Sequence, residues 1–274
     1  MLSSIAAVLT LASEQEGLLT TMQAQRRGIS RLELSRLATH DVIERVAHGV
    51  YITPEGSMKP HSELRAAWMA LDPHTFAYER LDAGSVGFSV THRSAAELHG
   101  LGQLIPDVYE FVSTTPKRTR REDVRIRRRS IGEVDITIVH GLPCTSVERT
   151  IADLAESHED LSLVADALYD AELSVINVER LCTLLDPVAK INDHESGTKF
   201  LRFLMRVGGL EKKVVASVLA DALDPTGQST GRQLWHLSSG VNPEPSKDIF
   251  LRDLVKGNLP ALRSFVNEFS DEPE

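Results

Sequence analysis

The side chains best suited to chemistry in this chain are three hydrogen-bond donors on one short predicted helix, Arg31, Ser35 and Arg36. A protein that contacts base edges in the major groove of DNA needs such cations and hydroxyl groups on one exposed helix face. Four further donors flank this helix and are candidates for contacts to the phosphate backbone, namely Arg26, Arg27, Arg45 and His48. The alternative interpretation is a solvated surface on a helical hairpin, because residues 1–53 hold five Arg and five acidic residues and are neutral as a whole.

Local capping signals predict how these donors are positioned. Thr20 or Thr21 can cap a first helix, and Gly28 stands where a left-handed residue ends it. Ser30 follows, with Glu33 three residues later, so this pair forms a capping box that begins a second helix. The expected apolar positions of that second helix are Leu32, Leu34 and Leu37.

A hairpin is predicted directly after the second helix. Residues 42–46 and 50–53 are β-prone, and residues 47–49 between them suit a tight turn. The order of helix, turn, helix and hairpin is that of a winged helix-turn-helix. We place this domain at residues 1–54, with a turn-rich joint after it.

A second group of cations follows further along the chain, where residues 117–129 carry eight Lys or Arg and two acidic residues. Alternation within a predicted strand places Arg125 and Arg127 on one face. The preceding loop adds Lys117, Arg118, Arg120 and Arg121. We expect these six residues to make an auxiliary contact to nucleic acid. The alternative is a solvated edge strand that is protected by its charges.

The remaining chain predicts an α+β protein. Residues 108–112, 124–127 and 134–139 are β-prone and closely spaced, which favours a small, mostly antiparallel sheet in a mixed domain at 58–187. A helical C-terminal region follows at 188–274. The predicted helices of the C-terminal half are 160–173, 177–186, 197–207, 211–223 and 246–256.

No residue pattern in the sequence predicts a metal site or a cofactor. Cys144 and Cys182 are isolated in apolar surroundings, which indicates buried free thiols and no thiolate zinc site. His92 and His99 are seven residues apart, so they lie two helical turns from each other and lack the spacing of a helical zinc site. We therefore expect both histidines to be hydrogen-bonded or capping residues.

An enzyme is the rival class of protein, with Asp135, Glu148 and Asp153 as candidate carboxylates of a nuclease or nucleotidyltransferase. Arg149 and Asp153 are four residues apart on a predicted helix, so an intrahelical ion pair is the simpler interpretation. The sequence contains no glycine-rich phosphate loop and no paired-carboxylate motif. We therefore expect no catalytic residues.

Composition indicates a cytoplasmic globular protein with no membrane association. The chain has 274 residues and a net charge of −9, and no apolar run is long enough to span a bilayer. Charge is uneven, because residues 131–274 hold 13 basic and 24 acidic residues. A more basic N-terminal half and an acidic C-terminal half favour two partners of different charge.

Three segments, taken in order, resemble the AbiEi-type antitoxins of type IV toxin–antitoxin systems, which are also called abortive-infection systems. The first is the predicted winged helix, with Gly17–Thr20, Arg27–Ser30 and Arg45–Tyr51. The other two are VTHRSAAELHGL at 90–101 and GLPCTSVERTIADL at 141–154. The resemblance covers roughly residues 5–185, and residues 190–274 match no motif of the family.

This resemblance implies a bifunctional antitoxin that acts in phage defence. Its winged helix would bind inverted repeats of operator DNA at its own promoter and repress transcription, with two copies needed for a two-fold repeat. Its C-terminal part would counter a cognate nucleotidyltransferase-like toxin, with or without a stable complex. A stand-alone transcription factor with a sensing C-terminal domain is the alternative.

Overall fold

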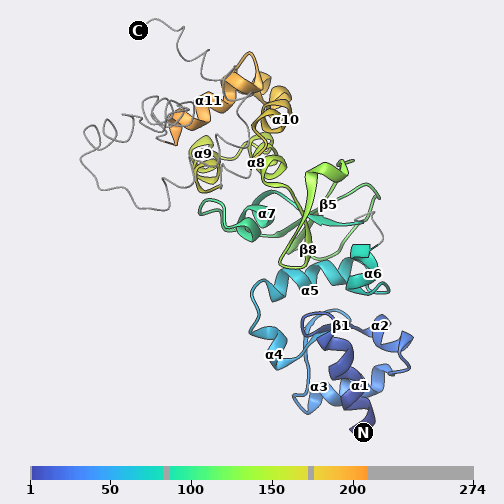
Figure 1. Cartoon of the computed structure of the whole chain (residues 1–274). Coiled ribbons are helices and arrows are strands. Elements are labelled where there is room, and N and C mark those ends of the chain that lie inside the picture. Colours follow the sequence, from blue (N-terminus) through green and yellow to red (C-terminus); the bar gives the residue numbers. More distant parts are fainter. Residues whose placement is uncertain (1, 83–86, 172–175, 209–274) are drawn as a thin grey trace, which may run out of the picture. The chain divides into compact units, whose positions relative to one another are not determined.

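A computed structural model describes residues 2–82, 87–171 and 176–208 (Figure 1). The chain divides into two compact units, of which the first contains residues 1–90 and 107–144. The second contains residues 91–106 and the chain from 145 onward. The predicted helices at 211–223 and 246–256 lie outside the described residues. The three-domain division with boundaries near 54 and 187 stays a prediction.

The first unit begins with the predicted winged helix-turn-helix, drawn in blue in Figure 1. Its elements are α1 (Leu2–Ser13), β1 (Leu18–Thr20), α2 (Thr21–Arg26), α3 (Arg31–Thr39), β2 (Glu44–Ala47) and β3 (Val50–Ile52). The strands form an antiparallel sheet in the order β1-β3-β2, so the predicted hairpin gains a third strand, which lies between α1 and α2 in the sequence. Apolar side chains from all three helices meet in one core, which includes Val8, Ala24, Leu34 and Leu37.

The predicted capping box at Ser30 is confirmed, and Thr20, one of the two predicted caps of the first helix, forms a second capping box. Thr20 caps α2, with its side chain accepting from the backbone of Gln23, whose side chain accepts from the Thr20 backbone in return. Ser30 and Glu33 make the same reciprocal pair at the start of α3. These caps satisfy backbone N–H groups that a helix N-terminus otherwise leaves without partners.

The helix α5 (Ser62–Leu71) joins the winged helix to the rest of the first unit. It follows the short α4 (Pro54–Ser57) and contacts all three strands of the small sheet. The Arg65 side chain of α5 donates to the His140 carbonyl, and Glu63 accepts from the Tyr109 hydroxyl (2.7 Å). Because Tyr109 lies in β5 of the second sheet and His140 lies in the turn between its strands β7 and β8, α5 contacts both sheets of this unit.

The second sheet has five strands in the order β6-β5-β4-β8-β7. These strands are β4 (Ser89–Val90), β5 (Tyr109–Ser113), β6 (Val124–Arg128), β7 (Ile136–Val139) and β8 (Leu142–Thr145). Helix α6 (Ala77–Asp82) precedes β4, and a 3-10 turn at Glu133–Asp135 precedes β7. Trp68 of α5 is buried in this unit, where its indole N–H donates to the Phe88 carbonyl (2.9 Å).

The α+β class is confirmed, but the expectation of a mostly antiparallel sheet is wrong. Strands β4 and β5 are antiparallel, whereas β5–β6 and β4–β8 are parallel pairs. Two parallel neighbouring strands need a crossover connection, which takes the chain back to the end of the sheet where the first strand began. Residues 114–123 supply one between β5 and β6, and the long excursion between β4 and β8 supplies the other.

The second unit is helical in its described part. Its helices are α7 (His92–His99), α8 (Val147–Glu156), α9 (Leu161–Asp170), α10 (Val178–Ile191) and α11 (Gly197–Val207). They share an apolar core that includes Ile151, Leu168, Leu185 and Phe200. Helix α10 continues through Pro187 beyond the predicted end at 186, because the following turn buries Val188 and Ala189 in this core.

Candidate nucleic-acid interface

The helix α3 is held in the winged helix by its apolar side and by its first turn. Leu34 and Leu37 are buried in the domain core. Ser4 of α1 donates to Glu33 Oε1 (2.6 Å), and the Ser30 backbone and hydroxyl both donate to Glu33 Oε2 (2.8 Å each). These hydrogen bonds, led by the one from Ser4, lower the pKa of Glu33 to about 2. The opposite side of the helix is therefore presented to solvent in a fixed orientation.

The solvent side of α3 carries all three predicted groove-contacting residues. Arg31, Ser35 and Arg36 are exposed. Within the residues that the structure describes, the side chains of Arg31 and Arg36 form no ion pair. Two exposed cations that form no ion pair within the described residues leave their charge available to a ligand.

Leu32 corrects the sequence prediction for α3. It was expected on the apolar side with Leu34 and Leu37, yet its side chain is 60% exposed. The reason is geometric, because successive helical residues are about 100° apart, which turns Leu32 well away from the other two leucines. Sequence reasoning missed this residue because it counted apolar residues instead of following their angular positions.

The hairpin of β2 and β3 places Arg45 and His48 together at its exposed end. Arg45 Nη2 lies 3.2 Å from His48 Nδ1, and Arg45 Nε donates to the Ala47 carbonyl (3.4 Å). The ladder has an irregularity between Arg45 and Ala47, which lets the strand twist at this point. Both predicted wing residues thus lie side by side on a solvent-exposed turn.

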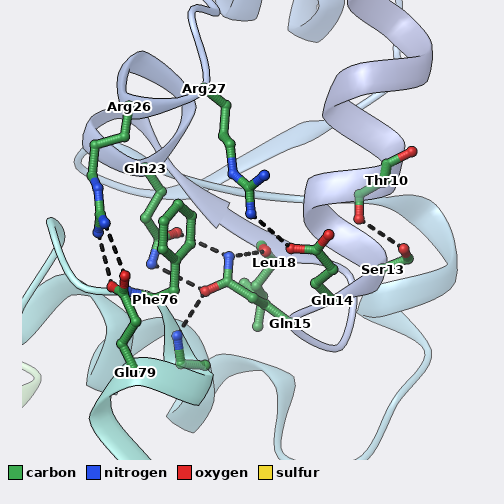
Figure 2. Close-up of polar contacts among 11 residues, drawn as sticks. Thr10, Ser13, Glu14, Gln15, Leu18, Gln23, Arg26, Arg27, Phe76 and Glu79 are labelled. Carbon is green, nitrogen blue, oxygen red and sulfur yellow. Dashed lines mark hydrogen bonds and ion pairs between the residues drawn. The ribbon is translucent and has the colours of Figure 1, made fainter.

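Arg26 and Arg27 are held by other parts of the protein (Figure 2). Arg26 donates through Nη1 and Nη2 to the two carboxylate oxygens of Glu79, at 2.8 Å each, and its guanidinium lies 4.4 Å from the Phe76 ring centre. Arg27 pairs with Glu14 at 3.4 Å and lies 5.2 Å from the same ring. These two arginines differ from Arg31 and Arg36, because their charges already have acidic partners.

A buried pair of glutamines lies beside this cluster. Gln15 and Gln23 exchange hydrogen bonds between their side-chain amides (3.0 and 3.1 Å). Gln15 also accepts from the Ala77 backbone, and Gln23 donates to the Thr75 carbonyl. Figure 2 shows the amide pair in the same cluster as Phe76 and the two arginines. The segment at 74–79 therefore attaches to α2 by both polar and aromatic contacts.

The basic run at 117–129 is partly neutralised. Arg125 and Arg127 both pair with Glu110 Oε1 of the neighbouring strand, at 3.5 and 3.0 Å, so they share one face as predicted. Arg121 pairs with Asp123, and Lys117 donates to the Leu71 carbonyl. The two exposed arginines of the loop, Arg118 and Arg120, have no such partner among the described residues.

The carboxylates of the rival enzyme hypothesis are engaged in structural contacts. Asp153 Oδ1 accepts from Arg149 Nε (2.8 Å) and Oδ2 accepts from the Thr91 hydroxyl (3.0 Å). Glu148 Oε1 accepts from the Asn177 backbone (2.7 Å), and Asp135 is buried. The predicted ion pair between Arg149 and Asp153 is confirmed.

The two histidines of the second motif have local partners. His92 Nδ1 lies 3.0 Å from the Thr91 hydroxyl, and His99 Nε2 lies 2.8 Å from the Thr145 carbonyl. Burial lowers the pKa of His99, against the hydrogen bond to Thr145. Across the described ranges, no three His, Cys, Asp or Glu side chains gather in a group that could hold a metal ion.

Cys144 is buried, which raises the pKa of its thiol, whereas Cys182 is only partly buried.

The order of elements and the exposed face of α3 define a winged helix-turn-helix domain. Residues 7–54 match the family described as a transcriptional regulator, AbiEi antitoxin. This match confirms the resemblance for the N-terminal domain, which is a regulator domain of the AbiEi antitoxin type. None of the curated proteins matches this chain.

The solved structures that are similar to this chain include one from a mycobacterium. The RV2827C protein from Mycobacterium tuberculosis has a TM-score of 0.47 and 19% sequence identity. The match covers 74% of this chain and 76% of that chain. Among the described helices, none is both long and apolar enough to cross a membrane.

Proposed function

We propose that this chain is a non-enzymatic antitoxin that represses its own operon by binding inverted repeats in the promoter. The observation that carries the proposal is the contrast among the arginines of the winged helix. Arg26 and Arg27 are paired with acidic residues, whereas Arg31 and Arg36 stand on the solvent face of α3 without one. A helix that exposes two such arginines fits the major groove. There an arginine can hydrogen-bond to the edge of a guanine or contact a phosphate beside the groove.

The wing supports the same orientation. Arg45 and His48 at the turn of the hairpin supply donors for the phosphates that flank the groove. The proposal therefore assigns base contacts to α3 and backbone contacts to the wing. A two-fold operator would bind two copies of the chain, one on each half-site. Access to chromosomal DNA requires a cytoplasmic location.

The second activity in the proposal is neutralisation of a nucleotidyltransferase-like toxin in a type IV system for phage defence. Its support is the match of residues 7–54 to an antitoxin family, together with the resemblance of the two downstream motifs. Co-expression with the adjacent gene product tests it, because growth should be rescued by the full chain. Co-purification of the two proteins would then separate a direct complex from indirect opposition.

Operator binding is tested by titrating the full chain against the DNA upstream of its own gene at several salt concentrations. Arg31→Ala/Arg36→Ala should weaken binding by about tenfold or more, since a good arginine–base contact contributes roughly 1–3 kcal/mol. If these arginines bind phosphate, the slope of log K against log salt should fall by about one per lost contact and protein copy. Operator binding by the double variant at wild-type affinity would refute the assignment of α3.

Arg118→Ala/Arg120→Ala provides a matched control with the same charge change outside the winged helix. A small effect of this control localises recognition to α3. An effect as large as that of the α3 variant would instead support the auxiliary contact at 117–129. Metal-dependent cleavage of the DNA by purified protein would favour the nuclease hypothesis, and operator binding without toxin rescue would favour a stand-alone transcription factor.

A further inference from the structure

The exposed arc of α3 has an apolar residue within it. Taking about 100° per residue, the solvent-exposed positions in angular order are Arg31, Ser35, Thr39, Leu32 and Arg36, which span about 140°. The two arginines thus mark the borders of the arc, and Leu32 lies between them. An isolated exposed leucine is common on protein surfaces, so its placement within this arc is the informative observation.

Thr39 lies on the same side of α3 as Leu32, about two turns further along the helix. The Thr39 hydroxyl donates to the Ser35 carbonyl (3.0 Å), so its proton is already used within the helix. Leu32 is also in the first turn of α3, next to Arg31. In helix-turn-helix proteins, the N-terminal residues of the recognition helix make the base contacts.

The major groove offers one apolar group that this leucine could contact, the C5-methyl group of thymine. We propose that Leu32 packs against a thymine methyl group in each operator half-site, with Arg31 and Arg36 on either side at guanine or phosphate. This inference rests on the proposed function and adds to it a base preference. Leu32 then determines specificity by apolar contact, whereas the arginines supply most of the affinity.

Replacing thymine with deoxyuridine tests the contact, because uracil lacks only the C5-methyl group. The full chain is mixed with promoter DNA in which a few thymines per molecule are replaced at random, and bound and free DNA are compared position by position. We expect the wild-type protein to discriminate by about fourfold at one thymine per half-site. That ratio corresponds to about 0.8 kcal/mol, the value for burying one methylene-sized group.

Leu32→Ala should remove this discrimination while leaving the fold intact, since the side chain is exposed and alanine favours helix. Leu9→Ala is the matched control, because Leu9 is also exposed, on α1. It should keep the wild-type pattern of uracil-sensitive positions.

The outcomes separate this inference from the proposed function. Operator binding without any uracil-sensitive thymine overturns the role of Leu32 and leaves repression intact. An unchanged pattern in Leu32→Ala also overturns it, because another side chain then reads the methyl group. Failure of the wild-type protein to bind the promoter DNA at all contradicts the proposed function, and with it this inference.

Discussion

Arg26 and Glu79 face each other with Nη1 and Nη2 of the guanidinium each 2.8 Å from a carboxylate oxygen. The guanidinium also lies over the ring of Phe76. This pair joins α2 of the winged helix to the start of α6, 53 residues further along the chain. Arg26 also donates to the His74 carbonyl (2.8 Å). Arg26, which residue type alone would assign to DNA binding, thus helps to attach the winged helix to the segment at 74–79.

Arg26→Ala/Glu79→Gln should therefore weaken operator binding much less than Arg31→Ala does. The Arg26 charge is already balanced by Glu79, so its removal changes the field at the DNA surface little when Glu79 is neutralised as well. The sharp comparison is Arg26→Ala/Glu79→Gln against Arg31→Ala, measured by titration at one salt concentration. Equal losses in the two proteins would show that Arg26 leaves Glu79 to contact the DNA backbone.

Acid should destabilise the winged helix through Glu33, because its pKa is about 2 in the folded protein. An unfolded glutamate has a pKa of about 4.3, so the folded state favours the carboxylate. The resulting stability is fully present above the unfolded pKa and is lost as the pH falls from about 4.3 toward 2. Thermal unfolding between pH 6 and pH 2.5 measures this loss.

Glu33→Gln is the matched variant for the pH experiment, since glutamine keeps the length of the side chain and can still accept from Ser30. Its melting temperature should depend less on pH than that of the wild type over the same window. Parallel curves for the two proteins would mean that other carboxylates, such as Glu79, dominate the acid response.

Gly17 and Gly56 approach each other closely. Gly17 has φ +87°, and a Cβ atom there would overlap the Gly56 Cα atom and lie 2.9 Å from Thr53 Oγ1. Gly28 has a similar φ of +80° but no heavy atom within 4 Å of the corresponding position. Both substitutions to alanine impose backbone strain, of about 1–2 kcal/mol. Only the one at Gly17 adds a clash with backbone.

Gly17→Ala should therefore lower the free energy of unfolding by clearly more than Gly28→Ala, with a further cost of about 1–3 kcal/mol from overpacking. Urea titration followed by circular dichroism compares the two variants with the wild type. If the losses are equal, the contact between Gly17 and α4 does not contribute to stability.

The parts of the fold that could be predicted from sequence are those stabilised by neighbours in the chain. The capping boxes at Thr20 and Ser30 use partners three residues away, so residue type and spacing are sufficient. The short turn of the hairpin and the intrahelical pair of Arg149 with Asp153 are local for the same reason.

Other features depend on segments far apart in sequence and were not predicted. The strand β1 has only three residues, and it forms because the returning β3 pairs with it. The partners of Arg26 and Arg127 likewise become visible only when Glu79 and Glu110 are placed by the folded chain. For the candidate site, residue type and spacing indicated a helix that the fold exposes to solvent, whereas only the fold separated the cations without an acidic partner from the paired ones.

The ion pair of Arg149 with Asp153 is buried, and Asp153 is also a candidate carboxylate of the enzyme hypothesis. Both carboxylate oxygens of Asp153 accept hydrogen bonds, from Arg149 and from Thr91, and both members of the pair are buried. Asp153→Ala would leave the buried Arg149 cation with the more distant Glu156 carboxylate (3.7 Å) in place of this partner and should cost up to about 3–5 kcal/mol of stability.

The double variant Asp153→Ala/Arg149→Met should recover much of that loss. In this variant an apolar side chain replaces the buried Arg149 charge, which has lost its main partner. Urea unfolding of the wild type and the two variants measures the difference. A structural role predicts recovery of stability together with retained operator binding. A double variant that is as unstable as Asp153→Ala would show that Asp153 matters through contacts other than the pair.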